Sequence, residues 1–251
     1  MKIKTYIINL KESVERREQT LKEVSHYPFM DIEWVEAVNG RTLTEEQVEL
    51  LFDRKKFSYR YEYEPLPGEI GCTLSHRECY RRLLCSDEEY ALILEDDVLF
   101  QHSEDIPFVF DNIDKVMKFR KNCMLILVNH YFYLPKSFFM LGDYTFYRVL
   151  LGAGTCAYLI NRGAARKLLS VSRASIVADD FQYMSIKGIY IMGIYPFLAL
   201  GASSLNIIGS EIQVNKHAVW NIPFKYRIIK LFWYKIYGLL LRLKIMKKSG
   251  R

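Results

Sequence analysis

An acidic interruption within an apolar run places the strongest constraint on the fold of this chain. Residues 91–94 are apolar, Glu95, Asp96 and Asp97 follow directly, and apolar residues resume at Val98. Such a run predicts a buried strand that breaks into a loop at its carboxyl end. Because adjacent carboxylates repel one another and are costly to bury, they are best tolerated at a sheet edge that faces a cation.

The three carboxylates allow two interpretations. Hard oxygen ligands suit Mg²⁺ or Mn²⁺, and such ions usually also hold substrate phosphates. Glu95, Asp96 and Asp97 therefore predict either a metal–diphosphate site or an ordinary acidic turn after a strand.

The amino-terminal segment predicts a strand over residues 4–10 and a helix from 14 to about 25, with Ser13 as a plausible N-cap. Arg16 and Arg17 lie on the first turn of this helix. A helix N-terminus with nearby Arg side chains commonly holds phosphate, and the alternative is a solvated helix face.

The rest of the chain alternates between strands and helices. Further strands are predicted over residues 32–38, 124–128, 151–160 and 190–195. Helices are predicted over residues 42–52, 68–85, 108–120 and 164–171, with irregular segments over 53–67 and 129–147. This alternation predicts a mainly parallel α/β sheet, which binds ligands at the carboxyl ends of its strands.

Two polar pairs within this pattern are candidate functional groups. Ser75 and His76 lie inside the predicted helix over 68–85, where a lone His is more often structural than a ligand. Asp179 and Asp180 stand at the start of another predicted helix, near its positive dipole end. They are interpreted either as an N-cap pair or as the source of a general base.

The composition limits the class of protein. A chain of 251 residues suffices for one large α/β domain or two small ones. Its five cysteines include no CxxC pair, so we expect reduced thiols in a cytoplasmic protein and no zinc site. The amino terminus does not resemble a signal peptide.

Positive charge is concentrated at the carboxyl end. Ten of the 35 Lys and Arg residues lie between Lys216 and Arg251, where there is no Asp or Glu. Residues 224–248 are both apolar and basic, and charges interrupt them too often for a transmembrane span. We therefore expect residues 1–222 to form the main domain, and 223–251 to form a basic amphipathic helix that binds an anionic membrane surface or packs on the body.

Four motifs in order carry a resemblance to a known family. They are Ile8-Asn9-Leu10 with Ser13 and Arg16-Arg17, residues 37–40 (Ala-Val-Asn-Gly), residues 68–76 (Gly-Glu-Ile-Gly-Cys-Thr-Leu-Ser-His) and residues 94–98 (Leu-Glu-Asp-Asp-Val). Over residues 4 to about 200 the chain resembles glycosyltransferase family 25, the lipooligosaccharide galactosyltransferases, and is similar to collagen galactosyltransferases.

The resemblance implies a GT-A fold and inverting transfer of a hexose. The expected donor is UDP-galactose, the expected acceptor is a lipooligosaccharide or lipopolysaccharide, and the expected cofactor is Mn²⁺ or Mg²⁺. The implied nucleotide-sugar-binding residues are Asn9, Leu10, Arg16, Arg17, Ala37, Asn39, Ser75, His76, Glu95 and Asp96. The implied metal ligands are Asp97, Glu95 and His217. Residues 177–181 resemble a later acidic motif of the family, and Ala178 and Asp180 depart from its commonest form, so either Asp179 or Asp180 is the implied base.

The expected partners are therefore a UDP-sugar, a lipid-linked oligosaccharide and an anionic membrane surface, with no nucleic acid. The enzyme would be cytoplasmic and peripherally associated with the inner face of the cytoplasmic membrane. One alternative is a non-catalytic protein of the same fold that binds a nucleotide or glycan. A metal-dependent phosphohydrolase is a further alternative, but it would usually carry an Asp nucleophile on its first strand, which here ends in Asn9-Leu10.

Overall fold

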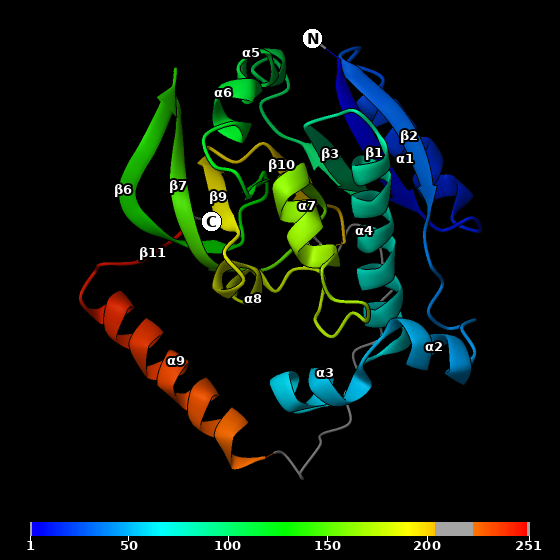
Figure 1. The fold of residues 1–251 in the computed structure, drawn as a ribbon. Coiled ribbons are helices and arrows are strands. Elements are labelled where there is room, and N and C mark those ends of the chain that lie inside the picture. The colour runs from blue at the N-terminus through cyan, green and yellow to red at the C-terminus, as the bar shows by residue number, and fades with distance from the viewer. Residues whose placement is uncertain (1, 204–222, 250–251) are drawn as a thin grey trace.

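The computed structural model describes residues 2–203 and 223–249 (Figure 1). In this part of the chain, one large sheet has the strand order β11-β6-β7-β9-β5-β8-β3-β1-β2. Its strands are β1 (Ile3–Asn9), β2 (Met30–Glu36), β3 (Tyr90–Glu95), β5 (Cys123–Ile126), β6 (Tyr131–Leu141), β7 (Tyr144–Gly152), β8 (Ala157–Asn161), β9 (Tyr190–Tyr195) and β11 (Lys247–Lys248). A separate antiparallel pair consists of β4 (Val98–Phe100) and β10 (Ala199–Gly201).

Helices flank the sheet, and α4 and α7 lie side by side on one of its faces (Figure 1). The helices are α1 (Val14–Val24), α2 (Glu45–Leu51), α3 (Arg54–Tyr61), α4 (Pro67–Cys85), α5 (Ile106–Asp111), α6 (Ile113–Met117), α7 (Arg162–Leu169), α8 (Phe181–Ile186) and α9 (Phe224–Arg242). None of the helices in the described part is long and apolar enough to cross a bilayer.

The prediction of an α/β fold is confirmed, but the prediction of a mainly parallel sheet is wrong. Only the pairs β1–β2, β1–β3 and β5–β9 are parallel, among the strands described. The reason is that β8 runs antiparallel between β3 and β5, and that β6 and β7 form a hairpin. Nevertheless β1, β2, β3, β5 and β9 all point the same way, so their carboxyl ends meet at one edge.

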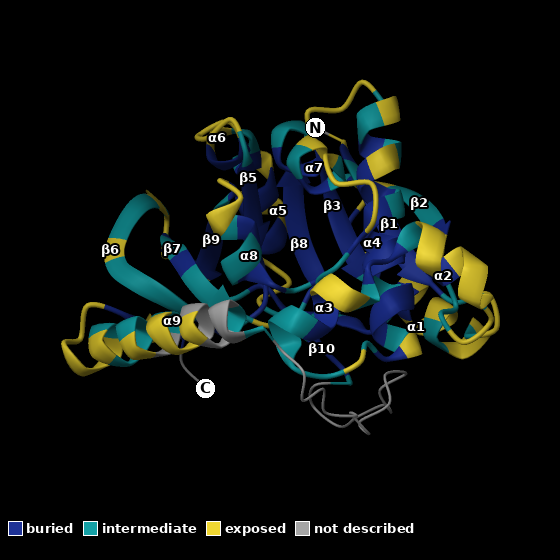
Figure 2. Ribbon diagram, turned by 60° about the horizontal axis from the view of Figure 1, so that its bottom comes forward, coloured by how far each residue is buried: buried dark blue, intermediate teal, exposed yellow. Residues whose placement is uncertain are grey.

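The apolar run that precedes the carboxylates forms the buried strand that was expected. Residues 91–94 on β3 are wholly inaccessible to solvent, and β3 lies between β1 and β8 in the sheet (Figure 2). Glu95 ends this strand, and Asp96 and Asp97 form the turn before β4. The carboxylates are thus delivered to the edge where the parallel strands end.

Three predictions about individual segments need correction. Residues 129–147 are not an irregular loop but form most of the β6–β7 hairpin. The physical reason is that aromatic residues, which are frequent in this segment, favour strands. Residues 53–67 include α3, whose first turn is capped by the Asp53 carboxylate (3.0 Å from the Lys56 N) and whose Phe57 side chain is buried. The strand expected over 151–160 is divided between the end of β7 and β8.

Two glycines bring the loop after β2 against the first turn of α4. A Cβ on Gly40 would lie 1.8 Å from the Pro67 carbonyl oxygen, and one on Gly71 would lie 2.3 Å from the Val38 carbonyl oxygen. The Ser75 hydroxyl accepts from the Val38 N–H at 2.8 Å and donates to the Gly71 carbonyl at 2.7 Å. Backbone therefore packs directly on backbone, which positions residues 37–40 beside α4.

We expect Gly71→Ala to lower the free energy of unfolding by about 1–3 kcal/mol, because the added methyl group overpacks a backbone contact that cannot move independently. Denaturant unfolding would measure the change. Gly238→Ala on α9 is the control, since no described atom lies within 4 Å of its added Cβ, and it should leave stability unchanged or raise it. Equal stability of Gly71→Ala and the parent protein would contradict the close-packing argument.

Candidate functional site

A cleft opens at the carboxyl ends of β1 and β3, between α1, the loop after β2 and the amino-terminal half of α4. Ten of the predicted site residues line it: Asn9, Leu10, Arg16, Ala37, Asn39, Ser75, His76, Glu95, Asp96 and Asp97. These residues come from four separate stretches of sequence, so the fold brings the four motifs to one place.

Four predicted site residues lie elsewhere or are not described. The Arg17 guanidinium lies 4.3 Å from the centre of the Trp34 ring, where it makes a cation–π contact. Asp179 and Asp180 are not among the residues that line the cleft as described. His217 falls outside the described residues, so its predicted role as a metal ligand stays a prediction.

The Asp96 carboxylate is bound by the protein itself. Asn9 donates to its Oδ2 at 2.7 Å, and Arg16 Nη2 lies 2.7 Å from its Oδ1. The Thr20 hydroxyl donates to the Asp96 carbonyl at 2.8 Å. Burial raises the pKa of Asp96, while Arg16 and Asn9 oppose the increase. Asp96 therefore ties the turn after β3 to β1 and α1, and both of its oxygens already have partners.

Asp97 differs because one of its oxygens is unsatisfied. Its side chain is buried, Oδ2 accepts from the Ser203 N–H (3.2 Å) and hydroxyl, and Oδ1 has no hydrogen-bond partner in the structure as described. Burial raises the pKa of Asp97, and the neighbouring Glu95 carboxylate raises it further. An orphaned buried carboxylate oxygen is costly in the absence of a cation and is a suitable ligand for a hard divalent ion.

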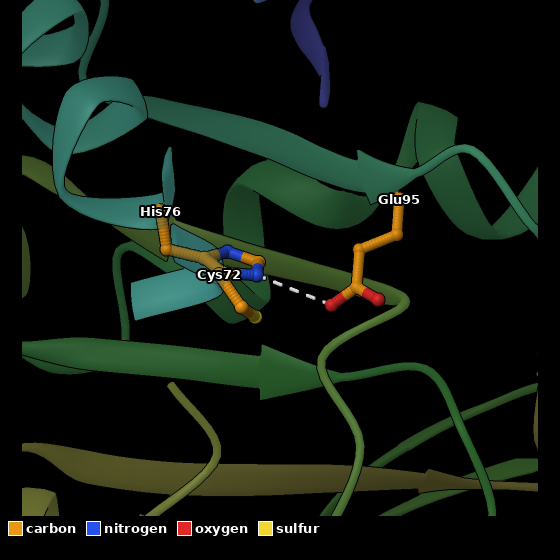
Figure 3. A group of neighbouring side chains, drawn as sticks. All are labelled: Cys72, His76 and Glu95. Atoms are coloured by element: carbon orange, nitrogen blue, oxygen red, sulfur yellow. Dashed lines mark hydrogen bonds and ion pairs between the residues drawn. The ribbon is translucent and has the colours of Figure 1, made fainter. Parts of the chain in front are cut away.

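Glu95 is held by polar groups from two other elements. Its Oε1 lies 3.1 Å from His76 Nε2 (Figure 3). The same oxygen accepts from the Thr155 hydroxyl at 2.6 Å. Although burial raises its pKa, the bonds from His76 and Thr155 hold the pKa of Glu95 below its ordinary value. The carboxylate is therefore ionised at neutral pH.

Cys72 is a cleft residue that the sequence analysis did not assign to the site. It lies one turn before His76 on α4, and the ligand atoms of Cys72, His76 and Glu95 are within 4.8 Å of one another (Figure 3). Burial, followed by the Glu95 and Asp179 carboxylates, raises the pKa of the Cys72 thiol well above its usual range. The i, i+4 spacing of Cys72 and His76 was the available signal. Ser203 was also missed, and nothing local in the sequence marks it.

The two acidic residues at the start of α8 have different environments. The buried Asp180 carboxylate caps α8 (2.8 Å from the Tyr183 N), pairs with Arg60 (Nη2–Oδ1 2.8 Å) and accepts from the Tyr61 hydroxyl. By contrast, Asp179 Oδ2 accepts from the Gly154 N–H at 2.8 Å. Burial raises the pKa of Asp179, and nearby Glu95 adds to the increase. Asp180 thus has a structural role, whereas Asp179 lies within electrostatic range of the cleft.

The cleft offers two donor sets for a metal ion. Asp97 Oδ1 and the Glu95 carboxylate are oxygen atoms of the type that Mg²⁺ or Mn²⁺ prefers, and Asp97 Oδ1 has no hydrogen-bond partner among the described residues. The second set, Cys72, His76 and Glu95, combines sulfur, nitrogen and oxygen. It is the one group of three or more Cys, His or acidic ligands at this spacing in the part of the chain described.

Comparisons with known proteins agree with the motifs. The sequence model of glycosyltransferase family 25 (LPS biosynthesis protein) matches residues 2–183. The chain is 34% identical over 115 residues to procollagen galactosyltransferase 2 of Homo sapiens, a match that covers 44% of this chain and 18% of the human protein. It is 35% identical over 101 residues to a glycosyltransferase 25 family member of Anopheles gambiae, with 38% and 17% of the two chains covered.

Because the family match extends over most of its length, the chain belongs to glycosyltransferase family 25. It spans less than a fifth of the two relatives named above. The apo-form glycosyltransferase GlyE of Streptococcus pneumoniae TIGR4 aligns with 99% of this chain and 65% of its own, at 12% identity and a TM-score of 0.30. An overlap at that score supports no argument about mechanism.

Substitution by Asn should change the stability of the protein differently at Asp179 and at Asp180. Asp180→Asn removes the charge that balances Arg60 and sets an amide against its donors, so we expect a loss of about 2–3 kcal/mol in unfolding free energy. The pKa of Asp179 is higher in the folded protein than its ordinary value of about 3.8. The protonated carboxyl group therefore stabilises the fold at low pH, and this stabilisation is lost as the pH rises from about 3.8 through the pKa of the folded state. Asp179→Asn should therefore be at least as stable as the parent protein at pH 7.

Thermal and denaturant unfolding of both variants at pH 7 measure this contrast. Each substitution conserves volume and leaves an acceptor oxygen, so the pair serves as its own control. Destabilisation of Asp179→Asn to the same degree as Asp180→Asn would contradict the assignment of different roles.

Proposed function

We propose that this chain is a metal-dependent inverting glycosyltransferase that uses a UDP-sugar, most simply UDP-galactose, as its donor. The observation that carries the proposal is the buried Asp97 Oδ1, which has no hydrogen-bond partner in the described part of the chain and lies in a cleft lined by the other family motifs. Membership of glycosyltransferase family 25 and the galactosyltransferase names of its relatives support the choice of reaction and sugar.

The donor nucleotide would lie between the end of β1 and the loop after β2. Asn9 and Arg16 line this part of the cleft while also holding Asp96, and Ala37 and Asn39 line its other wall. A guanidinium near the N-terminus of α1 is suited to a diphosphate, because both the charge and the helix dipole favour an anion there. Ser75 holds this wall in place through the Val38 N–H.

Asp97, assisted by Glu95, would hold a Mn²⁺ or Mg²⁺ ion. The chemistry that such an ion would supply is neutralisation of the negative charge that develops on the departing UDP. The protein contributes a carboxylate oxygen that is already desolvated, together with a Glu95 carboxylate that His76 and Thr155 keep oriented. These residues form the acidic side of the donor site.

Asp179 is the proposed base. Asp180 is the residue that fixes the backbone on which Asp179 is placed. Inversion needs a carboxylate that accepts the proton of the acceptor hydroxyl while this hydroxyl attacks the sugar directly. The pKa of Asp179 is raised by burial and by Glu95, which makes it a better proton acceptor than an exposed Asp. Asp180 is already engaged by Arg60, Tyr61 and the first turn of α8.

We expect Asp97→Ala to abolish metal-dependent UDP release, because no other buried carboxylate oxygen of the described cleft is without a partner. Asp179→Asn should lower kcat on the order of a hundredfold, with a much smaller change in UDP affinity, since general-base catalysis typically contributes 10²–10⁴-fold. A screen of UDP-sugars with Mn²⁺, followed by acceptor trials with lipooligosaccharide cores, provides the assay.

The control is Arg17→Gln, whose side chain packs on Trp34 away from the cleft and which should keep near-normal turnover. Retained metal-dependent turnover in Asp97→Ala would remove this residue from the metal site. UDP binding without release from any UDP-sugar would favour a non-catalytic binding protein of the same fold.

The proposed acceptor is a lipid-linked oligosaccharide, which the enzyme would meet at the inner face of the cytoplasmic membrane. In the proposed tail, residues 223–251, much of the described part of α9 is exposed or half-exposed (Figure 2). The exposed residues include both large apolar and basic ones. The exposed apolar residues are Ile228, Leu231, Phe232, Leu239 and Leu241. A helix of this kind is suited to the interface of an anionic bilayer. After α9 the chain returns to the body, where Met246 is buried and β11 pairs with β6.

Because β11 is part of the sheet, substitution tests the membrane proposal better than deletion of the tail. We expect the triple variant Leu231→Ser, Phe232→Ser and Leu239→Ser to lose most of its binding to anionic lipid vesicles, because it removes apolar area that would enter the bilayer. Co-sedimentation measures the bound fraction. Leu50→Ser on α2, where the side chain is 73% exposed, is the matched control. Undiminished binding of the triple variant would contradict the proposal.

A further inference from the structure

We propose that Cys72, His76 and Glu95 form a site for a thiophilic divalent ion of the Zn²⁺ type, distinct in chemistry from the hard-ion site at Asp97. The two sites share Glu95, so occupation by the thiophilic ion would remove a ligand from the other ion. Binding of the thiophilic ion does not depend on the proposed transferase activity. Inhibition of that activity, through loss of Glu95 from the other ion, rests on the proposed function.

The geometry of the three side chains suits a single ion. Cys72 and His76 are separated by one helical turn on α4, so they project from the same face, and Glu95 approaches from the end of β3 (Figure 3). His76 Nε2 and Glu95 Oε1 lie 3.1 Å apart. Two ligands of a tetrahedral zinc ion lie roughly 3.3 Å apart, given bonds of about 2.0–2.1 Å. For this pair an ion could thus replace the present hydrogen bond with a movement of a few tenths of an ångström, and the Cys72 sulfur lies within 4.8 Å of both ligand atoms.

The donor atoms determine which class of ion is favoured. A thiolate, an imidazole nitrogen and one carboxylate suit Zn²⁺ or Co²⁺, whereas Mg²⁺ and Mn²⁺ favour oxygen ligands. Three protein ligands would leave one position of a tetrahedral ion for another ligand. All three residues line the cleft. Four carboxylates act electrostatically on the Cys72 sulfur, namely Glu95, Asp179, Glu69 and Asp97, and such surroundings favour a cation.

Two hydrogen-bonded tyrosine hydroxyls next to His76 can stabilise the His76 tautomer that metal binding needs. His76 Nδ1 lies 2.8 Å from the Tyr158 hydroxyl, which lies 3.0 Å from the Tyr80 hydroxyl. When an ion binds Nε2, the ring proton must be on Nδ1. The Tyr158 oxygen can accept a hydrogen bond from this N–H while the Tyr158 O–H donates to the Tyr80 hydroxyl. The relay is buried, so it orients the ring in the manner usual for metal-bound His.

The test is titration of the metal-free chain of 251 residues with Co²⁺ and, in competition with a chelating dye, with Zn²⁺, in the absence of any UDP-sugar. We expect one equivalent of Co²⁺ to produce a thiolate-to-cobalt charge-transfer band and the strong visible absorption of a four-coordinate ion. Cys72→Ser should abolish that band and weaken Zn²⁺ binding on the order of a hundredfold or more, because loss of a direct ligand should cost at least as much as loss of an outer partner. The matched control is Cys85→Ser, at an exposed cysteine on the same helix. This variant should retain both the charge-transfer band and the affinity for Zn²⁺.

Tyr158→Phe separates an orienting role from a merely structural one. Removing the hydroxyl should retain the charge-transfer band but weaken Zn²⁺ binding by about 10–100-fold. Absence of the band in the parent protein, its persistence in Cys72→Ser, or its loss in Cys85→Ser would overturn the proposal. If the band is present but no UDP-sugar is turned over, the proposed function fails and the metal site stands. Turnover without the band gives the reverse result.

Discussion

The structure depends on how the fold compensates three consecutive carboxylates at the end of a buried strand. Burial of an ionised carboxylate is costly unless the group is paired or hydrogen-bonded. Asp96 is paired with Arg16 and Asn9, and Glu95 is bound by His76 and Thr155. Of the three carboxylates, only Asp97 retains a buried oxygen without a hydrogen-bond partner among the described residues. A cation beside that oxygen would offset the cost of burying it, and the two compensated carboxylates fix its surroundings.

The same principle distinguishes two adjacent residues that are chemically identical. Asp180 receives bonds from Arg60, Tyr61 and the first turn of α8, so its charge is balanced and its carboxylate is fully engaged. Asp179 receives a backbone N–H from Gly154, and its carboxylate is destabilised by burial and by Glu95. A group with a raised pKa beside a cleft is suited to proton transfer, whereas a balanced one is suited to holding structure.

Local patterns predicted the elements whose stability is mainly local or whose apolar period is clear. Examples are β1, α1, α4 and the buried strand β3. They failed for the β6–β7 hairpin, because pairing across the sheet and aromatic packing decide that segment. They also failed for strand direction, since the antiparallel placement of β8 between β3 and β5 leaves no periodic trace in the sequence.

The sequence by itself determined the order of the motifs, the family, the acidic strand end and the concentration of basic residues in the tail, because these are properties of composition and short-range spacing. Only the tertiary structure decided which polar atoms meet. Arg60 and Asp180 are 120 residues apart in the chain, and the meeting of Cys72 with Glu95 requires α4 to pack beside the end of β3. Pairing, burial and orphaned oxygens are long-range properties, so they become visible only when the chain has folded.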